Sequence, residues 1–157
     1  MRIIQANTAS ALEAARTLFR EYERYLGVDL CFQGFEQELA TLPGRYGPPS
    51  GRLLLAWEGE RAAGGVALRS LEAEGACEMK RLFVRPADRG QGLGRRLATR
   101  ILHEATALGY TVMRLDTLDT LEPAMRLYRE LGFQPCAPYY ANPLPGVMYW
   151  ERVLSNE

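Results

Sequence analysis

Hydrophobic residues recur at helical spacing in four stretches of the chain. The clearest covers residues 93–108, where an apolar residue returns every three or four positions. A second helix is predicted from near Ser10, behind an N-cap, with its apolar residues on one face and its arginines and glutamates largely on the other. A third is predicted over residues 123–131, ended by Gly132, and a short fourth over residues 35–42, ended by Pro43 and Gly44.

Between these helices, short apolar runs are typical of β-strands. They cover residues 2–5, 52–57, 61–68, 77–84, 112–116, 133–136 and 147–154. Residues 52–57 and 61–68 are joined by a three-residue turn that contains a glycine, which predicts a hairpin. The predicted order is β-α-α-β-β-β-α-β-α-β-β. It indicates an α/β domain that combines an antiparallel half with a parallel pair of strands around the helix at residues 93–108.

The composition fits a single globular domain over residues 1–157. The chain has 157 residues, of which 47% are hydrophobic, and this is enough to build a sizeable core. No repeat, low-complexity segment or internal linker divides it. Basic and acidic residues number 19 each, and the pI is near 6.6, so no global field favours nucleic acid or a membrane as a partner.

Other features bear on the cellular compartment and on metals. The apolar stretches are too short to cross a bilayer, and the first residues lead into a strand rather than a secretory signal. Cys31, Cys77 and Cys136 are widely spaced in apolar surroundings, which disfavours a disulfide framework. His103 is the only histidine, so we expect no metal site. These features predict a reducing compartment, most simply the cytoplasm.

A glycine-rich turn is the strongest chemical signal in the sequence. Residues 89–94 read RGQGLG and lie between an apolar strand and the helix that begins at Leu93. Such a turn presents unpaired backbone N–H groups at the positive end of a helix dipole, a geometry that binds phosphate. A P-loop would need lysine after its last glycine, where Arg95 follows Gly94. A dinucleotide fingerprint would need the spacing G-x-G-x-x-G, whereas these glycines alternate.

The turn does resemble the signature of the GNAT superfamily of N-acetyltransferases. That signature is arginine or glutamine, two residues, glycine, one residue, then glycine or alanine, and Arg89, Gly92 and Gly94 fill its positions. Residues 124–133, AMRLYRELGF, look like the family's penultimate helix and the strand after it. The resemblance implies a single domain with flanking helices and a mixed central sheet that splays at a parallel pair of strands.

The same resemblance implies acetyl transfer from acetyl-coenzyme A, as co-substrate, to a primary amine by direct attack. In the family, the glycine turn holds the pyrophosphate. The strand before it pairs its free main chain with the pantetheine arm and supplies a backbone N–H for the oxyanion. The implied cofactor contacts are Leu82, Phe83 and Val84 on the strand, and Arg89, Gly90, Gln91, Gly92, Leu93, Gly94 and Arg95 at the turn.

Glu78 looks like the strand glutamate that serves as general base in histone-acetylating members of the family. A base has a task here because an amine is almost entirely protonated at neutral pH. Strand alternation places Glu78 on one face with Lys80, Leu82 and Val84 unless a bulge intervenes. The alternative is a structural glutamate at a strand edge, paired with Lys80 or Arg81.

Tyr128 looks like the tyrosine that many members place in the penultimate helix as general acid, where its phenol returns a proton to the coenzyme A sulfur. The alternative is a core position on a helix face shared with Leu127 and Leu131. Both can hold, because a ring can pack while its hydroxyl reaches a polar partner. The chain departs from the family at Leu121, where members usually have an asparagine that contacts coenzyme A.

The acceptor is the least constrained part of the prediction. The substrate-binding candidates are Tyr22, Tyr25, Asp116, Tyr140 and Asn142. For each tyrosine the alternative is an amphipathic residue at the edge of the core, and for Asp116 it is a turn that leads into a helix. The aromatic loop at residues 139–143 suits a pocket for a small polar amine, which favours a small-molecule acceptor. A protein or peptide acceptor, a non-catalytic acyl-coenzyme A sensor and a homodimer stay open.

Overall fold

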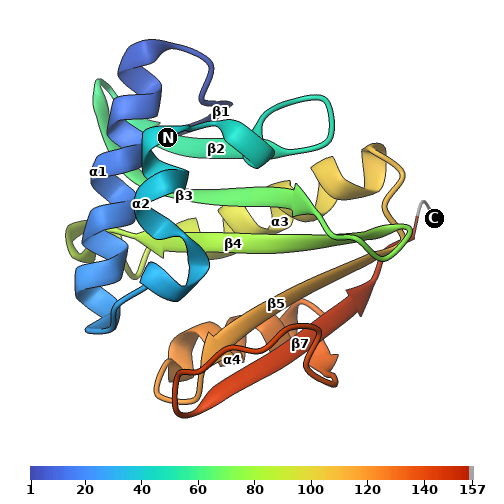
Figure 1. Cartoon of the computed structure of the whole chain (residues 1–157). Helices are drawn as coiled ribbons and strands as arrows, with labels where there is room; N and C mark the ends of the chain where they lie inside the picture. Colours follow the sequence, from blue (N-terminus) through green and yellow to red (C-terminus); the bar gives the residue numbers. More distant parts are fainter. Residues whose placement is uncertain (156–157) are drawn as a thin grey trace.

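A seven-stranded mixed sheet runs through the molecule in the computed structural model, which describes residues 1–155 (Figure 1). Its strands are β1 Arg2–Gln5, β2 Arg52–Glu58, β3 Arg61–Ser70, β4 Ala76–Val84, β5 Val112–Leu118, β6 Gln134–Pro135 and β7 Val147–Val153. They lie in the order β1-β2-β3-β4-β5-β7-β6. Only β4 and β5 pair in parallel, and the other neighbours are antiparallel. The predicted α/β class is confirmed.

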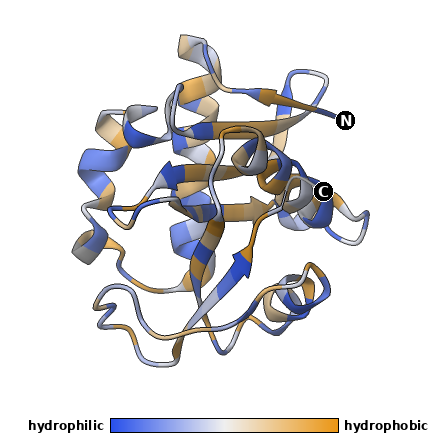
Figure 2. Cartoon of the chain, turned by 90° about the vertical axis from the view of Figure 1, so that its right-hand side faces the viewer, coloured by the Kyte–Doolittle hydropathy of each residue, from blue (hydrophilic) through white to orange (hydrophobic). Residues whose placement is uncertain are grey.

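Within residues 1–155, four α-helices cover the two faces of the sheet. They are α1 Ala9–Leu26, α2 Phe35–Ala40, α3 Leu93–Ala107 and α4 Glu122–Glu130, and 3-10 turns occupy Cys31–Gln33, Gly44–Tyr46 and Pro86–Asp88. Phe19 of α1 and Phe35 of α2 belong to a buried cluster on one face, whereas Leu97 of α3 and Met125 of α4 belong to a cluster on the other. Figure 2 shows the hydrophobic colour concentrated along the strands between these helices.

The element order predicted from the sequence is confirmed, and the boundaries agree within two residues. Two local details differ. The cap of α1 is Thr8, whose hydroxyl accepts a hydrogen bond from the backbone N–H of Ala11 at 3.1 Å, so the helix begins before the predicted position. The β2–β3 turn has two residues rather than three, because Glu58 already pairs with Arg61 in the ladder.

The parallel pair is joined only where its two strands begin. Residues 76–78 of β4 pair with residues 112–114 of β5, and no further ladder joins the two strands in the described part of the chain. Beyond this point the strands diverge (Figure 1). Each strand stays paired on its other side, β4 with β3 and β5 with β7, so the sheet opens as two halves. The predicted splay is therefore confirmed.

A bulge changes the direction of the side chains along β4. The register between β3 and β4 shifts, and β4 contains one residue more than β3 across the shift. Among the described residues, Arg81 is the only one besides glycines with a positive φ, at 61°. The single face was expected unless a bulge intervened, and this bulge is that exception for the residues beyond it. Leu82 and Val84 pack on the α3 side, whereas Glu78 and Lys80 remain on the opposite side.

Candidate active site

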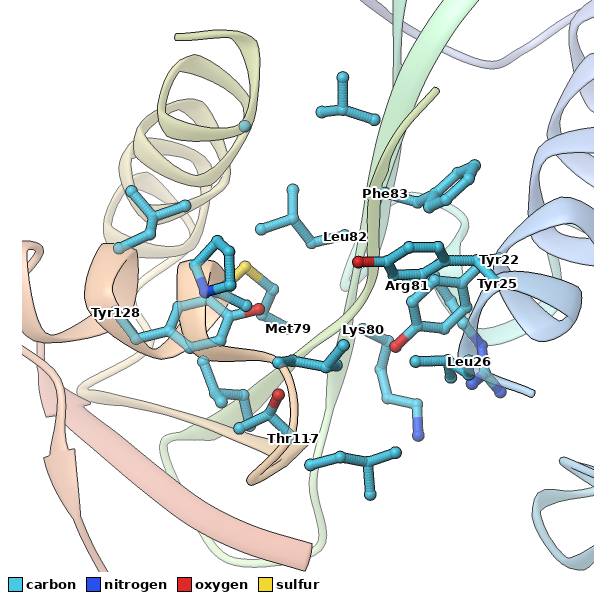
Figure 3. A pocket seen from close by; sticks show the side chains of 18 of the residues that line it. Tyr22, Tyr25, Leu26, Met79, Lys80, Arg81, Leu82, Phe83, Thr117 and Tyr128 are labelled. Carbon is cyan, nitrogen blue, oxygen red and sulfur yellow. The ribbon is translucent and has the colours of Figure 1, made fainter. Parts of the chain in front are cut away.

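A cavity of about 640 Å³ lies where β4 and β5 diverge (Figure 3). Its walls come from α1, β4, the glycine turn, β5, α4 and the loop after β6. Nine of the ten implied cofactor residues line it, and the tenth, Gln91, is exposed. The predicted catalytic and acceptor residues that line it are Tyr22, Tyr25, Asp116, Tyr128 and Asn142.

The glycine turn has the geometry of an anion site. Gly90 and Gly92 have φ values of 82° and 76°, a region that glycine adopts at little cost. Gly92 caps α3 without a side-chain hydrogen bond, and its carbonyl accepts from the N–H of Arg96 at 3.1 Å. Helix geometry leaves the N–H groups of residues 93–95 without intrahelical partners. They therefore favour a negatively charged group at this end of the cavity.

Two arginines flank this turn and are held in different ways. Arg89 donates from Nε to the carbonyl of Val84 at 2.9 Å, and its guanidinium lies 4.4 Å from the centroid of the Tyr25 ring. Arg95 forms an exposed ion pair with Glu130 at 2.9 Å. Both arginines line the cavity, so both add positive charge near the free N–H groups.

The strand that leads to the turn offers unpaired main chain to the cavity. Leu82, Phe83 and Val84 lie beyond the last β4–β5 pair, on the edge of β4 that faces the opening. The Phe83 side chain is buried and contacts Tyr22 and Tyr25 of α1 with ring centroids 5.8 and 5.9 Å apart. The side chains therefore belong to the core. Apart from the Val84 carbonyl, which accepts from Arg89, this edge of the backbone has no partner strand among the described residues and can pair with an extended ligand.

Tyr128 combines core packing with access to the cavity. It is 7% exposed, and its ring packs edge-on against Phe133 with centroids 5.8 Å apart. Figure 3 shows its hydroxyl directed into the cavity from α4. Burial raises the pKa of Tyr128, so the phenol keeps its proton at neutral pH. Leu121, at the start of α4, also lines the cavity but has no hydrogen-bonding group to offer.

Glu78 is fully buried and is not among the residues that line the cavity, although Met79 and Lys80, which follow it closely on β4, are. Its Oε1 accepts a hydrogen bond from Nε of Arg69 at 2.7 Å, and its Oε2 accepts from the hydroxyl of Tyr139 at 2.5 Å. The expected alternative partners, Lys80 and Arg81, are therefore wrong, and the strand is central rather than an edge. The role of Glu78 as base stays a prediction, and it requires that one of these two partners move.

The predicted acceptor residues form a connected group around Asp116. Its Oδ2 accepts from Nδ2 of Asn142 at 2.8 Å and from the hydroxyl of Tyr140. Tyr140 lies behind the cavity wall and accepts from Nε2 of Gln33 at 3.0 Å and from Asn142 at 3.2 Å. Since two donors occupy the Tyr140 oxygen, its own proton points to Asp116. Asp116 is thus held as a hydrogen-bond acceptor, within β5 rather than in a turn.

Tyr22 and Tyr25 form the opposite wall of the cavity, on α1. Burial raises the pKa of Tyr22 to about 12. Tyr25 is half exposed, at 50%, and lies beneath Arg89. Tyr22 and Tyr25 therefore pack at the edge of the core and also line the cavity, so the core-edge role and the substrate-binding role are compatible.

Lys80 and Gln33 are two of the cavity-lining residues that were not predicted as site residues from the sequence. Both line the cavity, and Nζ of Lys80 donates to Oε1 of Gln33 at 3.2 Å. Lys80 is the only lysine in the sequence and lies in an apolar strand. These two facts could have identified it as a candidate site residue from the sequence alone. Gln33 lies in a short 3-10 turn and has no comparable signal.

The other expectations concern cysteines, metals and membranes. The three cysteines are free thiols, and Cys31 is exposed, so the expectation of apolar surroundings is wrong for it. Among residues 1–155, no group of three histidine, cysteine, aspartate or glutamate side chains is placed to hold a metal ion. No helix in the described part is both long and apolar enough to cross a membrane. The cytoplasmic location and the homodimer stay predictions.

Comparison with known proteins decides the family. The model of the acetyltransferase (GNAT) family matches residues 11–133, which is most of the chain and includes β4, the glycine turn and α4. The chain belongs to the GNAT family. It is an N-acetyltransferase that depends on acetyl-coenzyme A, as the resemblance implied.

Relatives of this GNAT chain align with it over nearly their full length. An uncharacterized N-acetyltransferase of Schizosaccharomyces pombe is 46% identical over 146 residues, which cover 92% of this chain and 90% of the relative. An IAA acetyltransferase of Azospirillum brasilense is 36% identical over 146 residues, covering 90% and 92% of the two chains.

Solved structures share the fold of this GNAT chain. An acetyltransferase of the GNAT family from Staphylococcus aureus superposes with a TM-score of 0.82 at 19% identity, over 98% of this chain and 99% of the other. A Salmonella typhimurium structure, solved with its cofactor acetyl-CoA, gives a TM-score of 0.74 at 22% identity, over 100% and 95%. At these identities the likeness establishes the architecture.

Proposed function

We propose that this chain transfers the acetyl group of acetyl-coenzyme A to the amine of a small molecule inside the cavity at the splay. One observation carries the proposal: a single cavity joins the free N–H groups of α3, the unpaired main chain of β4, the Tyr128 hydroxyl and the Asp116 carboxylate. The N–H groups hold the pyrophosphate, and the main chain of β4 pairs with the pantetheine arm. In this binding mode we expect the thioester to lie between α4 and β4.

The proposed reaction is direct attack of the neutral amine on the thioester carbonyl. A C–N bond forms, the carbonyl oxygen becomes an oxyanion that a backbone N–H of β4 stabilises, and the C–S bond then breaks. The amine loses a proton to a base, and Tyr128 gives its proton to the leaving thiolate. Tyr128 lines the cavity and is protonated at neutral pH, which supports this role.

Two carboxylates compete for the role of base. Glu78 occupies the family's position, but both of its oxygens are engaged by Arg69 and Tyr139, outside the cavity lining. Asp116 lines the cavity, and the hydrogen bonds of Tyr140 and Asn142 both reach one of its oxygens, Oδ2. Its Oδ1 is therefore the better placed of the two to bind an ammonium group and accept its proton.

A small acceptor is supported by the loop after β6. Asn142 and Leu144 of this loop line the cavity, and Tyr139 and Tyr140 hydrogen-bond the carboxylates of Glu78 and Asp116. A loop held by these hydrogen bonds at the cavity favours a small acceptor over an extended peptide. The name of the Azospirillum brasilense relative, an IAA acetyltransferase, points in the same direction.

The test is release of free coenzyme A thiol on mixing the protein, acetyl-coenzyme A and a broad set of amines, with products identified by mass spectrometry. We expect turnover with at least one small amine and none with a peptide mixture. Turnover confined to peptides would replace the small acceptor by a protein acceptor. Tight binding of acetyl-coenzyme A without turnover of any amine or peptide would make the chain a sensor.

A further inference from the structure

Lys80 is a buried cation at the acceptor end of the cavity. It is 6% exposed, and its side chain extends from β4 into the cavity (Figure 3). An ammonium group has three donors, and Lys80 uses one of them on Gln33 at 3.2 Å. No carboxylate of the described residues forms an ion pair with it, whereas buried charges are ordinarily paired.

The cations around Lys80 are already neutralised. Arg81, the next residue, makes two hydrogen bonds to Glu38, at 3.0 and 3.1 Å. Arg69 on the neighbouring strand is paired with Glu78 at 2.7 Å. Among the described residues, Lys80 is therefore a buried positive charge that lines the cavity without an ion pair of its own. Glu78 and Asp116 act on it only from a distance, and its Nζ lies 6.0 Å from the centroid of the Tyr140 ring. Burial lowers the pKa of Lys80 to about 8, which leaves it mostly protonated at neutral pH.

A hydrogen-bonded bridge separates this cation from the anion of the site. Gln33 accepts from Lys80 and donates to Tyr140, and Tyr140 donates to Asp116. The two charged groups are thus held apart by two side chains and both line the cavity. A ligand that spans them would need a positive group at one end and a negative group at the other.

We propose that the acceptor is an amino carboxylate, whose ammonium group binds Asp116 and whose carboxylate binds Lys80. The proposal rests on the acetyl transfer proposed above and specifies its substrate class. The substrate carboxylate forms the ion pair that Lys80 lacks within the described residues. It accepts hydrogen bonds from the two N–H groups of the Lys80 ammonium that Gln33 does not use. The same arrangement disfavours amines that carry a second positive charge, because that charge would lie next to Lys80.

The first test compares acceptors that differ only in the carboxylate. A set of α-, β- and γ-amino acids is assayed for coenzyme A release, each beside its own carboxamide, in which the negative charge is absent. We expect kcat/KM to be about 10- to 100-fold higher for the acids, which is the worth of a hydrogen bond between charged groups. Equal or better turnover of the carboxamides overturns the proposal while the acetyl transfer stands. Turnover confined to amines without a carboxylate would likewise overturn the proposal and leave the acetyl transfer in place.

Substitution of Lys80 tests whether this residue causes the preference for the acid over its carboxamide. In Lys80→Met, a side chain of similar length without charge, we expect the ratio of kcat/KM for the acid to kcat/KM for its carboxamide to fall by about 10- to 100-fold. Arg100→Met is the matched control, because Arg100 is an exposed cation on α3 outside the cavity. A preference that survives in Lys80→Met overturns the assignment.

A binding measurement keeps the inference separate from turnover. Because Lys80 is the only lysine, incorporation of 15N-lysine gives a single side-chain signal. In the presence of coenzyme A, L-leucine and L-leucinamide serve as probes unless the assay identifies a better pair. We expect a saturable shift of the Lys80 signal with the acid and none with the amide. Equal shifts, or none, overturn the proposal even where no amine is turned over. A shift by the acid without any turnover supports the anion site while the acetyl transfer fails.

Discussion

At the scale of single residues, the site separates groups that reach the cavity from groups that shape it. Tyr128 and Asp116 line the cavity, whereas Glu78 is fully buried behind the wall against Arg69 and Tyr139. A side chain must approach the reacting atoms within hydrogen-bond distance to transfer a proton. Tyr128 and Asp116 line the cavity in which we propose that the reacting atoms bind, whereas Glu78 could reach them only if Arg69 or Tyr139 moved.

Tyr128→Phe should lower turnover by about 10²- to 10⁴-fold, the usual contribution of a general acid. Affinity for acetyl-coenzyme A and the unfolding free energy should change little, because the ring still packs on Phe133. The measurement is single-turnover kinetics under chemistry-limited conditions. Tyr110→Phe is a matched control, since its hydroxyl bonds the carbonyl of Ser50 away from the cavity. A Tyr128→Phe rate equal to wild type would make Tyr128 a core residue only.

Glu78→Gln and Asp116→Asn should separate the two candidate bases through their pH profiles. The variant of the true base should lose about 10²- to 10⁴-fold in turnover near neutrality. Its deficit should narrow as pH rises, because free amine becomes abundant and the need for a base fades. A deficit that stays constant across pH indicates positioning instead. Denaturation curves of both variants are needed as well, since Glu78→Gln breaks a buried ion pair and lowers stability.

At the scale of elements, the N-terminus of α3 has the local geometry that its glycine-rich sequence predicts. The positive φ values of Gly90 and Gly92 and the absence of a side-chain cap leave three N–H groups directed at the cavity. The bulge at Arg81 lies in β4, the strand that precedes the glycine turn, and it sets the direction of the side chains there. It turns Leu82 and Val84 toward α3 and leaves Lys80 on the acceptor side.

Gly92→Asp should weaken acetyl-coenzyme A binding by about 10- to 100-fold, because a carboxylate meets the pyrophosphate at the helix N-terminus. Calorimetric titration measures the change. Gly59→Asp is the matched control, because Gly59 also has a positive φ, 62°, with nothing within 4 Å of an added Cβ, and lies in the β2–β3 turn. If the two variants bind alike, the turn does not hold the pyrophosphate.

Gly94→Ala should change stability and binding in opposite directions. An added Cβ would lie 3.8 Å from Val84 and 3.9 Å from Leu127, which is ordinary contact, and alanine favours a helix by about 1 kcal/mol over glycine. We therefore expect a higher unfolding free energy with weaker acetyl-coenzyme A binding, since the methyl group occupies the ligand's approach to the N–H groups. Stabilisation with unchanged affinity would contradict the proposed path of the cofactor.

At the scale of the whole molecule, the sheet opens because its halves are each held by antiparallel partners while the parallel pair is short. The opening places polar groups from both halves around one cavity. It also requires the fold to tolerate an unpaired cation, Lys80, in a position that is 6% exposed. A buried charge without an ion pair costs stability.

Lys80→Met should raise the unfolding free energy at pH 7 by about 1–3 kcal/mol, measured by urea denaturation. Below pH 8 both the folded and the unfolded wild type carry the charge, and only the folded state bears the cost of burying it. Between pH 8 and 10.5 the folded state has lost the proton that the unfolded state keeps, so wild-type stability rises with pH. The advantage of the variant should therefore shrink over that range. A variant less stable than wild type at pH 7 would contradict the cost assigned to Lys80.

Features that depend on residues close together in the sequence could be predicted from the sequence alone. Periodicity placed α3 and its buried Leu97 and Ile101, because helical burial repeats every three or four positions. Glycine spacing located the turn, because the conformation of Gly90 and Gly92 is a local property of the backbone. The element order and the family signature followed from the same short-range patterns.

Contacts between side chains that are distant in the sequence follow from the folded structure alone. Gln33 and Tyr140 lie 107 positions apart in the sequence, and Lys80 and Gln33 lie 47 apart, yet they form one hydrogen-bonded bridge. No period or spacing encodes such contacts, because they arise from the packing of the 3-10 turn and the last loop against β4. The bulge at Arg81 likewise depends on the register between strands. The glycine turn was therefore predictable from the sequence, whereas the proposed acceptor site, with Lys80 and Asp116 at the two ends of the bridge, forms only in the folded chain.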